Sequence, residues 1–86
     1  MIQKILAPIS LTLQYDHHTK KTEIIGVLWE GRQYPIVKLG LHHTYRQGRT
    51  LYHVFSVAGQ TLFFKLVLNT DTLHWTLEEI ADDLTN

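Results

Sequence analysis

Hydrophobic and polar residues alternate along much of the chain with the two-residue period of a β-strand. The segment from Leu51 to Leu77 shows this most clearly and reads as three strands joined by tight turns. Because successive strand side chains point to opposite faces, the alternation predicts one shared apolar face. Its predicted members are Leu51, Phe55, Val57, Leu62, Phe64, Leu66, Leu68, Leu73, Trp75 and Leu77.

The turns between these strands predict a register for each hairpin. Gly48 suits the left-handed third position of a three-residue loop, Gly59 suits the first position of a two-residue turn, and residues 69–72 read as a four-residue loop. The predicted pairs are Leu39 with Phe55, Leu41 with His53, His43 with Leu51, Val57 with Leu62, Phe55 with Phe64, Leu68 with Leu73, and Leu66 with Trp75. This register adds Val37, Leu39, Leu41 and Tyr45 to the apolar face.

The first half of the chain also reads as strands. Residues 9–15 alternate, residues 16–22 form a polar loop, and residues 23–29 form a second strand that ends in a turn at Glu30-Gly31. A long strand follows over residues 32–45. Pro35 favours an edge or a bulge in it, and Gly40 favours a bend. A strand bent in this way can serve two sheets at a corner.

The C-terminal segment has two alternative interpretations. Thr76 and Glu79 have the spacing of a capping box, and the apolar residues that follow have helical spacing (Leu77, Ile80, Ala81 and Leu84). In the alternative, the strand at Trp75 continues through Glu79. We therefore expect a single small domain over residues 1–86 that is all-β, or β with one short C-terminal helix. Its antiparallel meander of five to six strands would form a small, partly open barrel or a bent sheet.

Composition narrows the function classes only slightly. The 86 residues hold 8 Lys and Arg against 8 Asp and Glu, so there is no overall charge that attracts nucleic acid or anionic lipid. The chain has no cysteine, which excludes disulfides and thiolate metal sites. No apolar run approaches the length of a membrane-spanning helix, and the first residues lack the features of a signal peptide. We therefore expect a cytoplasmic protein.

One segment resembles a known family. The run Trp29-Glu30-Gly31-Arg32-Gln33-Tyr34 is similar to the Trp-x-Gly-Arg-x-Tyr hairpin of a family of small bacterial domains of unknown function. Later runs from Leu51 to Val54, from Leu62 to Leu66 and from Trp75 to Leu77 are similar too, so that the resemblance spans residues 24–82. Some relatives accompany error-prone DNA-repair polymerases, which implies an association with nucleic acid. The family has no assigned catalytic residues.

The second face of the predicted meander is also apolar, which favours a protein-interaction function. Such a patch must be covered by another part of the fold or by another chain. We expect a non-catalytic interaction or assembly module that self-associates as a homodimer or docks on another protein, with no cofactor and no membrane partner. The predicted interaction patch is Trp29, Tyr52, Val54, Phe63 and Val67.

Nucleic-acid binding is the first alternative. Proteins that bind single strands combine a basic groove with aromatic platforms. Here the basic and aromatic residues follow the long third strand and its turns, and they predict a single-stranded nucleic-acid-binding module linked to DNA repair. The residues predicted for this role are Arg32, Tyr34, Lys38, Arg46 and Arg49.

The six histidines raise a further alternative, a histidine-based metal site. In the predicted register His43 and His53 share the apolar face and lie diagonally, while His42 points to the opposite face. No carboxylate is placed to complete such a site, so we expect these histidines to be structural and assign no metal ligand. No phosphate-binding loop or nucleophile motif is visible, and we expect no enzymatic activity.

Overall fold

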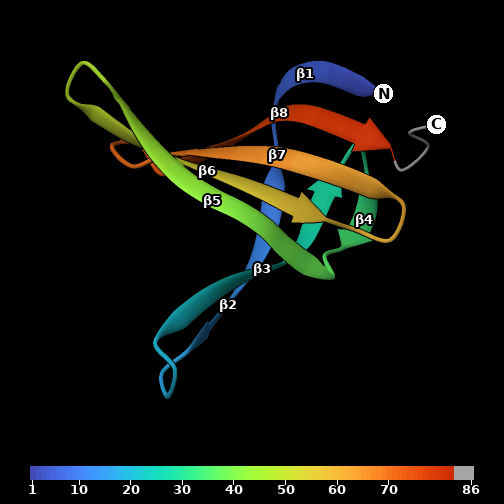
Figure 1. Ribbon diagram of the computed structural model, residues 1–86, viewed down its shortest axis with the longest axis horizontal. Coiled ribbons are helices and arrows are strands. Elements are labelled where there is room, and N and C mark those ends of the chain that lie inside the picture. Colours follow the sequence, from blue (N-terminus) through green and yellow to red (C-terminus); the bar gives the residue numbers. More distant parts are fainter. Residues whose placement is uncertain (83–86) are drawn as a thin grey trace.

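The alternating pattern corresponds to eight antiparallel strands in a computed structural model that describes residues 1–82 (Figure 1). The protein is all-β, as predicted, with eight strands in place of the predicted five to six. The two additional strands arise because residues 2–8 form a strand and the predicted third strand divides in two. The strands are β1 (Ile2–Pro8), β2 (Ser10–Asp16), β3 (Lys21–Trp29), β4 (Arg32–Pro35), β5 (Lys38–Gln47), β6 (Thr50–Ala58), β7 (Leu62–Asn69) and β8 (His74–Asp82). They form a five-stranded sheet in the order β1-β8-β7-β6-β5 and a three-stranded sheet in the order β2-β3-β4.

Two bent segments carry the chain between the sheets. Only Ile9 separates β1 from β2, and only Ile36 and Val37 separate β4 from β5. The second corner is pinned on both sides, because Ile36 N–H donates to Ile25 O in one sheet and Val37 N–H donates to Ala58 O in the other. The segment predicted as the third strand therefore serves two sheets, but it divides into β4 and β5 at Ile36 and Val37, and the predicted bend at Gly40 is a bulge within β5. The sheets are not closed into a barrel.

The predicted apolar face of β6, β7 and β8 is confirmed, but its pairing is shifted. Phe55 pairs with Leu66, which pairs with Leu77, and Val57 pairs with Phe64. The sequence prediction of Val57 with Leu62, and of Leu68 with Leu73, was wrong by two residues. A shift of two keeps every side chain on its predicted face. Leu73 is the exception, because it lies in the turn before β8 with a φ of 62°.

From Leu41 onward, the β5–β6 pairing is shifted by three residues from the prediction, because Phe55 pairs with His42 and not with Leu39. An odd shift moves the β5 side chains to the opposite face of the sheet. The turn is a two-residue turn at Gly48-Arg49 between Gln47 and Thr50, not the predicted three-residue loop. His42 therefore pairs with Phe55, and Tyr45 pairs with Tyr52 on the opposite face. Leu41 and Tyr45 leave the predicted apolar face for this reason. Leu39 stays on it, because a bulge at Gly40 shifts the register.

The predicted C-terminal helix was wrong, and the alternative strand is found. β8 runs without interruption through residues 77–82, paired with β7 on one side and β1 on the other. A bulge at Glu78 inserts one residue between the pairs made by Leu77 and Glu79, so Ile80 pairs with Phe64. This bulge makes the apolar spacing resemble that of a helix. Leu84 lies outside the described residues.

The core lies between the inward face of the five-stranded sheet and the three-stranded sheet. Its buried members come from both sheets: Val27, Val57, Phe64, Leu66 and Leu77. Partly buried side chains from β1, β2, β3 and β4 pack around them, including Trp29 and Tyr34. The tips of the β2–β3 and β5–β6 hairpins extend beyond this core and diverge (Figure 1). Side chains near the two tips are therefore left without a covering layer.

Candidate interaction surface

The most exposed regular element is β5, an edge of the five-stranded sheet. All ten of its residues are exposed, and within residues 1–82 it pairs only with β6. The bulge at Gly40 places Leu39 on the inward face and Leu41 on the outward face. These two side chains are 54% and 58% exposed. β5 therefore presents both an unpaired backbone edge and apolar side chains on either side of it.

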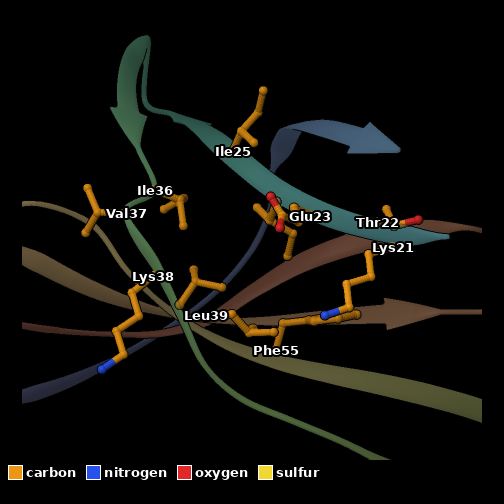
Figure 2. A pocket seen from close by; sticks show the side chains of 11 residues that line it. Lys21, Thr22, Glu23, Ile25, Ile36, Val37, Lys38, Leu39 and Phe55 are labelled. Carbon is orange, nitrogen blue, oxygen red and sulfur yellow. The ribbon is translucent and has the colours of Figure 1, made fainter. Parts of the chain in front are cut away.

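A cleft opens beside the first half of β5, between the two sheets. Its volume is about 470 Å³, and its walls come from β3, from the corner at Ile36 and Val37, and from β5 and β6. Apolar side chains form the floor, where Leu39 lies beside Phe55 (Figure 2). Lys21 reaches down from β3 toward Phe55, and Lys38 points away from the cleft. The cleft thus has an apolar floor, and Lys21, Thr22 and Glu23 of β3 line its polar wall.

An aromatic row continues from this cleft along the inward face toward the β5–β6 tip. The rings of His42 and Phe55 stack with centroids 4.3 Å apart and an interplanar angle of 3°. His42 Nε2 and His53 Nδ1 are 2.7 Å apart, within hydrogen-bond distance. Phe55 also contacts Trp75, with centroids 5.5 Å apart. The row joins residues of β5, β6 and β8 on one face of the sheet.

The structure corrects which histidines meet. The predicted pair was His43 and His53, but His43 pairs with Val54 and lies on the outward face. His42 takes its place because the two-residue turn reverses the faces of β5 from Leu41 onward. His17 and His18 lie in the β2–β3 turn, with ring centroids 4.0 Å apart.

The predicted interaction patch is not one exposed surface. Val54 and Val67 pair with each other on the outward face, but they are buried, with exposures of 2% and 7%. Trp29 belongs to the three-stranded sheet and packs against the core. Tyr52 is half-buried and stacks on Tyr45, with centroids 4.9 Å apart. Only Phe63, 43% exposed, is open to solvent as expected.

The predicted nucleic-acid set is divided between two ends of the molecule. Arg32 and Tyr34 lie in β4, where the Arg32 guanidinium carbon is 5.9 Å from the centroid of the Tyr34 ring. The Tyr34 ring itself packs against Phe64 of the core at 5.3 Å. Arg46 and Arg49 flank the β5–β6 tip, at the far end of that hairpin (Figure 1). Lys38, at the start of β5, borders the cleft, but its side chain points away from it.

The outward face carries a small charged cluster in place of a continuous apolar patch. Lys65 Nζ lies 3.0 Å from Glu78 Oε1 and 3.9 Å from Glu79 Oε2. The hydrogen bond to Glu78 raises the pKa of Lys65 above its ordinary value, against the opposing effect of desolvation. Lys65 is the one Lys or Arg of residues 50–86, and two acids of the same segment thus neutralise it within the sheet.

Within residues 1–82 no group of three or more His, Cys, Asp or Glu side chains is arranged to hold a metal ion. The same part of the chain contains no helix that is long and apolar enough to cross a membrane. The sequence matches no protein-family model, no curated protein and no solved structure.

Proposed function

We propose that this protein is a non-catalytic interaction module that self-associates through β5. The observation that carries the proposal is a ten-residue edge strand whose residues are all exposed. An edge strand offers a row of unpaired N–H and C=O groups, which template the addition of another strand. Pairing with an extended segment satisfies these groups and covers neighbouring apolar side chains together.

The apolar side chains around β5 add a reason for association. Val37, Leu39 and Leu41 are each more than half exposed, on a chain of only 86 residues. A small domain buries a lower fraction of its surface than a large one, so association is an effective way to bury more. Removing such side chains from water is favourable by about 25 cal/mol per Å².

A second copy of the chain is the partner that we propose. An antiparallel edge strand can pair with its own copy about a two-fold axis, which gives a closed dimer. β5 contains Lys38 and Arg46 but no carboxylate, so a self-pairing register has to keep these cations apart. The cations stay apart if Lys38 of one copy lies opposite Gln47 of the other. Leu39 then lies opposite Arg46 of the second copy. This symmetric pairing joins two five-stranded sheets into one.

Light scattering after size-exclusion chromatography, over a range of concentrations, tests the proposal. The wild-type protein is expected to be dimeric at high concentration and to dissociate on dilution. Leu41→Lys is expected to be monomeric, because a lysine on an exposed edge opposes strand addition. A strictly monomeric wild-type protein at the highest concentration would refute self-association.

Leu13→Lys is the matched control. Leu13 is 45% exposed and lies on β2, in the other sheet, so the same substitution changes charge and exposed apolar area without touching β5. The control is expected to remain dimeric. Equal dissociation of both variants would place the contact elsewhere or show a general effect of added charge, and would contradict the assignment to β5.

A further inference from the structure

We infer that His42 and His53 form a two-imidazole site for a late first-row divalent metal ion, of which Cu²⁺ is the best-matched probe. The two side chains come from neighbouring strands and lie on the same face of the sheet. Their rings are nearly parallel, with an interplanar angle of 18° and centroids 5.0 Å apart. The site belongs to one chain and does not depend on self-association.

The two ring nitrogens lie close enough to bind one ion together. His42 Nε2 and His53 Nδ1 are 2.7 Å apart. With metal–nitrogen bonds of about 2.0 Å, two tetrahedral ligands lie about 3.3 Å apart, whereas two adjacent square-planar ligands lie about 2.8 Å apart. The observed 2.7 Å is an N–H···N hydrogen-bond distance, and a small rotation of His53 brings the pair to either spacing. The choice of Cu²⁺ therefore follows from its high affinity for imidazole nitrogen and not from this distance.

The neighbouring aromatic ring holds one imidazole in place. His42 stacks face to face on Phe55, so its ring plane is fixed by packing while its edge stays exposed at the surface. The final ring torsion of histidine has a broad range, so a small rotation of His53 can direct both lone pairs to one ion. In the absence of metal, one ring nitrogen donates its proton to the other, and binding replaces this hydrogen bond.

The ion would have only two protein ligands. No third His, Cys, Asp or Glu completes the group within residues 1–82, so water fills the other positions. Two-ligand chelation by imidazoles suits Cu²⁺, which binds most strongly among the divalent first-row ions. The open positions distinguish this site from a closed structural zinc site.

Titration with Cu²⁺, followed by calorimetry and by electron paramagnetic resonance, tests the inference. His17 and His18 lie adjacent in a turn and offer a competing site, so the reference protein carries His17→Asn and His18→Asn. In this background we expect one ion per chain and a spectrum showing two imidazole nitrogens. Adding His53→Gln or His42→Gln is expected to weaken binding at least ~10-fold, by removing one arm of the chelate.

His43→Gln is the matched control, because His43 lies beside His42 in the sequence but on the other face of β5. It is expected to leave Cu²⁺ affinity unchanged. Circular dichroism of each variant without metal separates loss of binding from loss of the fold. An equal effect of His43→Gln, no effect of either His42→Gln or His53→Gln in a folded protein, or a spectrum with a single nitrogen would overturn the assignment.

Discussion

Lys65 faces two consecutive glutamates, Glu78 and Glu79, across the β7–β8 pair. Successive residues of a regular strand point to opposite faces, so a flat β8 would offer Lys65 only one of them. The bulge at Glu78 removes this restriction, because two residues of β8 then oppose one residue of β7. The bulge therefore determines the charge environment of this face.

The contact between Lys65 and Glu78 predicts a stability that depends on pH. The pKa of Lys65 is raised in the folded protein, chiefly by its hydrogen bond to Glu78. The contribution is therefore fully present below the unfolded value of about 10.5, and is lost as pH rises through the folded pKa. A double-mutant cycle with Lys65→Met and Glu78→Gln is expected to give about 0.2–1 kcal/mol at neutral pH. Urea unfolding at alkaline pH should show this coupling disappear; a coupling that persists would contradict the ion pair.

The turn at Gly48 predicts a cost for adding a side chain. Gly48 has a φ of +63° at the first position of its two-residue turn, and no neighbour would contact an added Cβ. Any penalty therefore comes from the backbone alone. Gly48→Ala is expected to destabilise by about 1–2 kcal/mol, and Gly48→Asn by less, because asparagine tolerates this conformation better. Denaturant unfolding measures both, and equal stability of alanine and glycine at this position would contradict the turn geometry.

Two leucines that the sequence places on the same face predict opposite outcomes. Leu77 is fully buried in the core, whereas Leu73 is 69% exposed in the turn before β8. Leu77→Ala is expected to cost about 2–5 kcal/mol, the range for a cavity in a packed core. Leu73→Ala is expected to change stability by less than about 0.5 kcal/mol. Thermal unfolding of the two variants compares them, and similar losses would show that β8 is paired differently.

The separation of the basic residues predicts weak binding of nucleic acid. Arg32 lies in β4 and Arg46 lies at the end of β5, so the two do not form one groove. We expect no change in the fluorescence anisotropy of a single-stranded oligonucleotide at low salt. A strong response that falls with salt, and is reduced by both Arg32→Ala and Arg46→Ala, would favour the nucleic-acid alternative over the interaction module.

The fold class and the inward face were predictable because both follow from the alternation of apolar and polar residues. An even shift in pairing leaves this alternation on the same face. Phe55, Phe64 and Trp75 stay on the predicted side even though their partners are shifted by two residues. Alternation alone therefore identifies the core-facing set. It cannot identify the pairs, because the same turn can form one residue further along the chain. The four-residue loop predicted over residues 69–72 lies at residues 70–73, which shifts each pair by two residues.

The candidate histidine site depended on whether the turn at Gly48 has two or three residues, and the sequence is compatible with both. Gly48 suits the third position of a three-residue loop and also the first position of a two-residue turn. The second choice brings His42, rather than His43, beside His53. The capping-box pattern at Thr76 was misleading for a similar reason, since a bulged strand and a helix can give the same apolar spacing.

The bulge at Gly40 also limits what β5 can accept. Before the bulge, odd-numbered residues such as Leu39 point to the inward face. After it, odd-numbered residues such as Leu41 point to the outward face. A partner segment without its own irregularity can stay in step only over residues 41–47. An edge of this kind selects short or matching partners and opposes the open-ended stacking by which uninterrupted edges grow into fibres.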